Sequence, residues 1–128
     1  MQLSIIVATL EGCTFEALDD AAAIDAMLEA AVAAGGFTLL HKHVHAFTPQ
    51  GVTGAAVLSE SHIAIHTWPE HGVLFVDIAT CSGDEATRAA FSAICDRISH
   101  TKVNENSFGY RSPALPGVPR PMTPPFLQ

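Results

Sequence analysis

The residues best suited to chemistry in this chain lie close together in its centre, between Ser59 and Cys81. This stretch combines hydroxyls, imidazoles, carboxylates and a thiol, on Ser59, Glu60, Ser61, His62, His66, Thr67, Glu70, His71, Asp77 and Cys81. A purely structural strand region rarely needs so many reactive side chains. The stretch is therefore the candidate active site.

The Glu60-Ser61 peptide bond is a candidate for self-cleavage. If the backbone is strained there, the Ser61 hydroxyl can attack the Glu60 carbonyl and convert the amide into an ester. A base that removes the Cα proton of Ser61 then eliminates the ester, and the chain breaks after Glu60. The new terminal dehydroalanine reacts with water, loses ammonia and becomes a pyruvoyl group. Its ketone forms a Schiff base with a substrate amine and draws electrons as pyridoxal phosphate does in other enzymes.

Two further side chains suit the steps around this cleavage. His66 is a candidate base, because imidazoles exchange protons near neutral pH. Cys81 is a candidate acid that returns a proton to carbon after decarboxylation. The two lysines of the chain, Lys42 and Lys102, lie outside the cluster, which disfavours a pyridoxal phosphate site.

A two-layer fold is predicted to position these residues. Apolar and β-branched runs predict strands over residues 3–10, 37–47, 52–58, 63–67, 73–80 and 103–110. Helices are predicted over 19–34 and 85–99, with Thr14 and Asp84 as caps and Gly35-Gly36 ending the first helix. This order predicts an α+β two-layer sandwich, a mostly antiparallel sheet with its helices on one face.

The face of the sheet without helices needs a cover. Hydrophobic residues make up 48% of the chain and charged residues only 15%. A second copy of the chain is the simplest cover, so we expect a homodimer formed through the sheets. The length of 128 residues predicts a single domain over 1–128, with an extended proline-rich tail over 113–128.

Composition also excludes classes of partner. The net charge is −7 and Lys and Arg number only six, so we expect no nucleic-acid partner. The three cysteines form no CxxC pair, which favours a reducing cytoplasmic location. Charges interrupt the apolar stretches, so we expect no membrane span.

The alternating histidines His41, His43 and His45 share one face of a predicted strand, and such spacing can bind a metal. No carboxylate or thiol lies at a supporting spacing. We therefore expect a polar or interface-facing strand rather than a metal site.

Four sequence blocks resemble the prokaryotic S-adenosylmethionine decarboxylase proenzymes. They are Gly51-Val52-Thr53-Gly54, Leu58-Ser59-Glu60-Ser61-His62, Ile65-His66-Thr67-Trp68-Pro69-Glu70, and Val76-Asp77-Ile78 followed by Thr80-Cys81. The resemblance is close from about Phe37 to Gly83 and absent in the tail.

The resemblance implies a self-cleaving, pyruvoyl-dependent decarboxylase of S-adenosylmethionine that supplies spermidine synthesis. It implies that Ser61 becomes the pyruvoyl group and Glu60 the new C-terminus, which gives chains 1–60 and 61–128. It makes His66 the processing base and Cys81 the proton donor. Thr53 stands where the family usually has serine and would assist processing.

The resemblance also implies a substrate site at a dimer interface. Glu70 would bind the ribose hydroxyls. Phe47 and Trp68 would frame the adenine or the sulfonium, since an aromatic face attracts a cation, and Phe47 would serve the neighbouring protomer.

Departures from the family around Cys81 leave alternatives open. The family's Phe-Thr-Cys-Gly is replaced by Ala79-Thr80-Cys81-Ser82-Gly83. One alternative is a pyruvoyl-dependent decarboxylase of ornithine or arginine. Another is a non-catalytic binding or regulatory protein on the same scaffold.

Overall fold

The strands of the described chain, residues 2–111 of this computed structural model, form one antiparallel sheet. They are β1 (Gln2–Glu11), β2 (Leu39–Ala46), β3 (Val52–Leu58), β4 (Ser61–Trp68), β5 (Val73–Thr80) and β6 (Lys102–Arg111). Their order across the sheet is β2-β3-β4-β5-β1-β6, and each neighbouring pair is antiparallel. The antiparallel sheet of the prediction is therefore confirmed.

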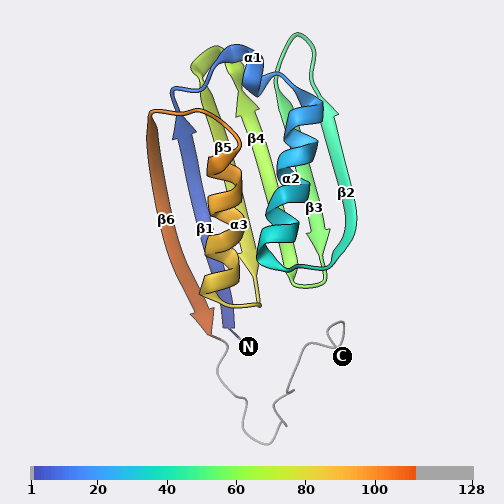
Figure 1. The fold of residues 1–128 in the computed structure, drawn as a ribbon, viewed down its shortest axis with the longest axis vertical. Coiled ribbons are helices and arrows are strands. Elements are labelled where there is room, and N and C mark those ends of the chain that lie inside the picture. Colours follow the sequence, from blue (N-terminus) through green and yellow to red (C-terminus); the bar gives the residue numbers. More distant parts are fainter. Residues whose placement is uncertain (1, 112–128) are drawn as a thin grey trace, which may run out of the picture.

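Helices cover one face of this sheet. They are α1 (Phe15–Leu18), α2 (Ala21–Gly35) and α3 (Asp84–Asp96), with a short 3-10 helix η1 (Pro69–His71) between β4 and β5. Figure 1 shows α2 and α3 lying side by side along the strands, which makes the predicted two-layer α+β sandwich. No helix within residues 2–111 is long and apolar enough to cross a membrane.

The core lies between the sheet and the two long helices. Every second side chain of each central strand points toward the helices and is buried, because successive side chains of a strand alternate between its faces. The largest fully buried apolar side chains are Leu10, Leu18, Ile24, Leu28, Val52, Ile63, Ile65, Leu74, Val76, Ile78 and Ile94. Each contributes about 1.5–3 kcal/mol by leaving water.

The helix predicted over 19–34 is α2, and the short helix α1 precedes it, outside the predicted range. The Thr14 hydroxyl accepts a hydrogen bond from the Ala17 amide and caps the start of α1, as predicted. The Asp20 carboxylate accepts from the Ala23 amide and begins α2. The second cap therefore separates α2 from α1. Gly36 ends α2 as predicted, because its φ of +68° suits glycine.

The last helix differs from its predicted limits of 85–99. It begins at Asp84, after Gly83, and ends at Asp96. The Asp84 carboxylate does not cap it, because it accepts a hydrogen bond of 2.6 Å from the Ser4 hydroxyl on β1. The β3 and β5 strands begin and end where predicted.

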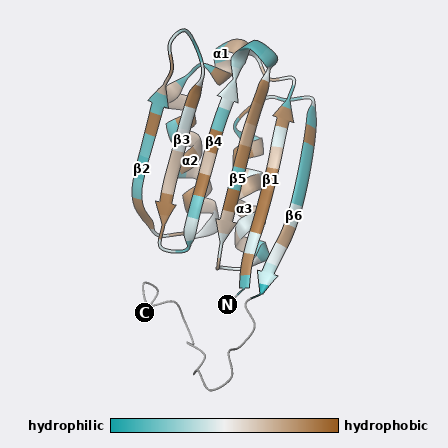
Figure 2. Cartoon of the chain, turned by 180° about the vertical axis from the view of Figure 1, so that it is seen from behind, coloured by the Kyte–Doolittle hydropathy of each residue, from teal (hydrophilic) through white to brown (hydrophobic). Residues whose placement is uncertain are grey.

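The other face of the sheet carries no helix in the described chain, and Figure 2 views the molecule from that side. We call it the open face. It presents half-buried apolar side chains such as Ile5, Val7 and Phe75, and exposed ones such as Val57 and Phe108. The predicted dimer through this face stays a prediction, and the predicted tail over 113–128 lies outside the described residues.

Candidate active site

The turn between β3 and β4 contains the bond predicted to break. Leu58 pairs with Ser61, so Ser59 and Glu60 form the tip of the hairpin. Ser61 has a φ of +136°, and no other non-glycine residue in 2–111 has a positive φ. Such a conformation costs on the order of 1–3 kcal/mol and persists only where the surroundings enforce it. The strain therefore lies at the Glu60-Ser61 junction.

Hydrogen bonds clamp the turn from both sides. The carbonyl oxygen of Glu60 accepts from the Cys81 amide at 3.0 Å, just after the end of β5. The Glu60 side chain is buried, at 5% exposure, and accepts from the Thr38 amide at 3.0 Å. The Ser59 amide donates to the Thr38 carbonyl at 2.9 Å. These contacts hold the strained turn and polarise the carbonyl that Ser61 would attack.

The Ser61 hydroxyl lies beside an imidazole and a carboxylate. Its Oγ is 3.4 Å from Nδ1 of His62, and Nε2 of His62 is 3.3 Å from Oδ2 of Asp77. The sequence places His62 and Asp77 in the reactive cluster but assigns them no role. Their contact depends on the β4–β5 register, in which Ala64 stands opposite Asp77, so the diagonal neighbour His62 reaches it.

A second group of predicted site residues lies at the other end of β4. Thr53 stands directly opposite His66, and its hydroxyl is hydrogen-bonded to Nδ1 of that histidine. The ring centroids of His66 and Trp68 are 4.3 Å apart, and those of His66 and Phe47 are 6.2 Å apart. Phe47, His66 and Trp68 form what we call the aromatic cluster.

Glu70 follows this cluster along the chain, in η1. Its Oε2 accepts a hydrogen bond of 2.8 Å from Nε2 of Gln50, which lies in the β2–β3 connection after Phe47. This bond is the main cause that holds the pKa of the Glu70 carboxyl below its ordinary value. Sequence reasoning missed Gln50, because a glutamine in a turn gives no signal of its own.

The predicted site residues thus fall into two groups at opposite ends of β4, the strand that lies between β3 and β5 in Figure 1. Ser61 and His66 are five positions apart on this strand, and a strand rises about 3.3 Å per residue, so about 16 Å separates them. A base must come within about 2.6–3.2 Å of the heavy atom that carries the proton. The structure gathers Glu60, Ser61 and Cys81 at one end, and Thr53, His66, Phe47, Trp68 and Glu70 at the other.

Metal ligands do not cluster in the described chain. Within residues 2–111, no three His, Cys, Asp or Glu side chains lie close enough together to hold a metal ion. His41, His43 and His45 lie on β2, at the edge of the sheet, and face the open side opposite Val57, Ala55 and Thr53.

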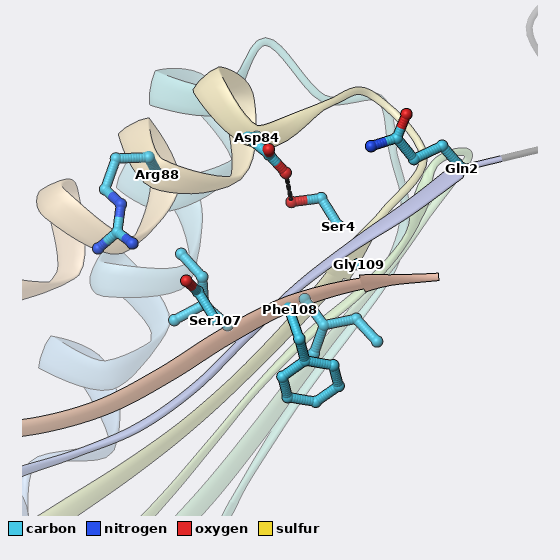
Figure 3. Close-up of a pocket in the computed structure, with 9 residues that line it drawn as sticks. Gln2, Ser4, Asp84, Arg88, Ser107, Phe108 and Gly109 are labelled. Atoms are coloured by element: carbon cyan, nitrogen blue, oxygen red, sulfur yellow. Dashed lines mark hydrogen bonds between the residues drawn. The ribbon is translucent and has the colours of Figure 1, made fainter. Parts of the chain in front are cut away.

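A cavity of about 390 Å³ lies away from these groups, between the start of α3 and strands β1 and β6 (Figure 3). Ser4, Asp84, Arg88, Ser107 and Phe108 line part of it. Its charged groups are already paired, because Asp84 bonds to Ser4 and the Arg88 guanidinium lies 2.7 Å from a Glu105 oxygen. None of the predicted site residues lines this cavity.

Comparison with known proteins places the chain in a family. The family model for S-adenosylmethionine decarboxylase matches residues 4–109. A proenzyme of this name from Sulfurihydrogenibium sp. is 42% identical over 100 residues, which cover 78% of this chain and 75% of that protein. Another from Methanococcus maripaludis is 57% identical over 76 residues, which cover 59% of this chain and 62% of that protein.

A solved structure agrees with these sequence matches. The crystal structure of the adenosylmethionine decarboxylase from Aquifex aeolicus superposes with a TM-score of 0.81 at 30% identity. The match covers 92% of this chain and 97% of that one. The chain therefore belongs to the S-adenosylmethionine decarboxylase family.

Proposed function

We propose that this chain is a self-cleaving, pyruvoyl-dependent decarboxylase of S-adenosylmethionine, whose product serves spermidine synthesis. The observation that carries the proposal is the strained Ser61, with its φ of +136°, joined to a Glu60 carbonyl that already accepts from the Cys81 amide at 3.0 Å. Membership of the family supports the substrate. The cleavage chemistry is supported by the geometry of the turn.

Self-cleavage uses groups of the chain itself. The Ser61 hydroxyl attacks the Glu60 carbonyl, and the developing negative charge on the carbonyl oxygen is stabilised by the Cys81 N–H. Collapse of this state breaks the amide bond and leaves an ester, and the release of the backbone strain at Ser61 favours that step. Removal of the Cα proton of Ser61 then separates the chains 1–60 and 61–128.

The new chain end fits a pyruvoyl group. It would lie at the first residue of β4, with the half-exposed side chains of His62 and Cys81 on neighbouring positions. The ketone of this group supplies an electron sink for the bond that breaks when carbon dioxide leaves. The buried Glu60 side chain keeps the new C-terminus attached to the start of β2 through the Thr38 amide.

Cys81 has two roles in this proposal. Its backbone N–H acts before cleavage, on the carbonyl of Glu60. Its half-exposed thiol acts afterwards, as the acid that returns a proton to the substrate carbon. The two roles belong to different atoms, so they can be separated by substitution.

A homodimer completes the site. His66 lies about 16 Å along β4 from Ser61 of its own chain, too far for direct proton transfer. A two-fold axis through the open face would bring the Thr53–His66 pair of one protomer onto Ser61 of the other. The apolar open face supports this arrangement, since Val57 is 48% and Tyr110 is 60% exposed in the single chain.

Substrate contacts would follow the same symmetry. Phe47, Trp68 and Glu70 lie at the His66 end of the sheet, so they would serve the Ser61 of the partner. Aromatic faces attract a sulfonium by about 0.5–2 kcal/mol. The Glu70 carboxylate supplies a charged acceptor for the ribose hydroxyls.

Intact mass and turnover test the proposal. We expect two fragments, 1–60 and 61–128, with the second resistant to Edman degradation because a ketone replaces its amine. Ser61→Ala should remain one chain. The processed protein should release carbon dioxide from S-adenosylmethionine with a higher kcat/KM than from ornithine or arginine.

Each outcome separates one alternative. A wild-type chain that stays intact after long incubation contradicts self-cleavage. Faster turnover of ornithine or arginine assigns a different substrate to the same chemistry. Release of carbon dioxide from none of the three favours a non-catalytic binding protein.

A further inference from the structure

We propose that His62, positioned by Asp77, is the base that takes the hydroxyl proton of Ser61 in the first step of self-cleavage. This inference rests on the proposed function. It divides the processing between two imidazoles: His62 of the same chain forms the ester, and His66 of the partner subunit eliminates it.

The contacts around Ser61 carry this assignment. The hydroxyl oxygen of Ser61 lies 3.4 Å from Nδ1 of His62, which is a long hydrogen bond. Catalytic hydrogen bonds are often long before the reacting groups close up. His62 is therefore the imidazole within reach of the nucleophile, whereas His66 of the same chain lies about 16 Å away.

The contact with Asp77 determines which ring nitrogen of His62 carries the proton. Its Oδ2 lies 3.3 Å from Nε2 of His62, so Nε2–H donates a hydrogen bond to the carboxylate and keeps its proton. A neutral imidazole that donates through one nitrogen leaves the other free to accept. The Asp77 contact thus presents an unprotonated Nδ1 to the Ser61 hydroxyl, in the order nucleophile, base and orienting carboxylate.

The step balances within the chain. The Ser61 Oγ–H proton passes to Nδ1 of His62 as Oγ forms a bond to the Glu60 carbonyl carbon. The Cys81 N–H stabilises the negative carbonyl oxygen. When the carbon–nitrogen bond breaks, the Ser61 nitrogen takes the proton back from His62. The products are the ester, a free amine and a neutral imidazole.

Freshly synthesised full-length chains test whether His62 forms the ester and His66 eliminates it. Wild type, His62→Ala, His66→Ala and the double variant are produced by cell-free translation and sampled with and without hydroxylamine, which cleaves esters. His100→Ala is the matched control, since His100 lies in the α3–β6 connection and bonds to the Ile98 carbonyl.

We expect His66→Ala to accumulate an ester that hydroxylamine releases. His62→Ala should slow ester formation by about 10²-fold or more, the usual contribution of a positioned base. The double variant should remain an amide that hydroxylamine does not cleave. Free imidazole should restore part of the rate of His62→Ala, which a merely structural role would not allow. Asp77→Asn should show a smaller loss.

Ester formation by His62→Ala at the wild-type rate would overturn the inference and leave the proposed function intact. Loss of the rate with no rescue by imidazole in a folded protein, judged by circular dichroism, would also overturn it. If His62→Ala does not fold, His62→Gln replaces it, because glutamine fills the same space and cannot accept the proton. A wild-type chain that never cleaves contradicts the proposed function itself.

Discussion

Because Ser61 and His66 lie at opposite ends of β4, we predict that each chain is cleaved with the help of His66 of the partner subunit. His66→Ala removes the proposed base from one chain, and Ser61→Ala removes the nucleophile from another. Each variant alone should fail to separate into fragments. When both are made in one cell, a mixed dimer contains one complete site, built from Ser61 of the first chain and His66 of the partner subunit.

The separation along β4 sets the size of the effect. About 16 Å divides the two residues in one chain, while proton transfer needs about 3 Å, so the base that acts on a given Ser61 must come from the partner subunit. With equal amounts and random pairing, about half of the His66→Ala chains meet a Ser61→Ala partner in a two-fold dimer. About half of them should therefore be cleaved, and none of the Ser61→Ala chains.

Distinct affinity tags on the two chains allow intact mass to count the fragments of each. The matched control pairs His66→Ala with the double variant Ser61→Ala/His66→Ala, in which every site lacks the base. Cleavage in this control, or none in the mixed pair, would refute the trans arrangement. Rapid cleavage of His66→Ala alone would show that another group is the base.

Three further outcomes follow from single contacts. Gly54→Ala should lower the free energy of unfolding by about 1–3 kcal/mol in urea titration, because the new Cβ would lie 2.9 Å from a methyl of α2. Cys81→Ala should cleave at the wild-type rate, measured by intact mass, because the amide of Cys81 and not its thiol contacts Glu60. It should lose most release of carbon dioxide, because the thiol is the proposed proton donor. A variant that no longer cleaves would contradict this prediction. Glu70→Gln should raise KM for S-adenosylmethionine. Because the pKa of Glu70 is lowered, the carboxylate of the wild-type protein stays charged as pH falls, and its protonation should raise KM only below about pH 4.5. Gln50→Ala removes the hydrogen bond that lowers this pKa, so in KM–pH profiles the rise in KM should begin at a higher pH.

Much of the fold follows from local pattern. The β3 and β5 strands are continuous apolar or alternating runs bounded by turns, so their limits are correctly predicted. Helix ends are less predictable. The cap at Asp20 starts α2 at Ala21 instead of residue 19. The carboxylate of Asp84, which the pattern assigns to a cap, accepts instead from the hydroxyl of Ser4, a residue distant in sequence.

The candidate site, like the fold, could be predicted only in part from the sequence. Residue types and spacing determine which side chains are candidates, namely Ser61, His66 and Cys81 for the reaction and Glu70 for the substrate. These chemical properties belong to the residues themselves and can be seen in the chain before it folds.

Only the tertiary structure decides which of these groups meet. Sheet register brings His62 to Asp77 and the Cys81 amide to the Glu60 carbonyl, and the hairpin forces the positive φ of Ser61. The same extended strand that makes Ser61 and His66 neighbours in sequence holds them about 16 Å apart in space. Proximity along a β-strand thus does not become contact, because an extended backbone cannot fold back on itself within five residues.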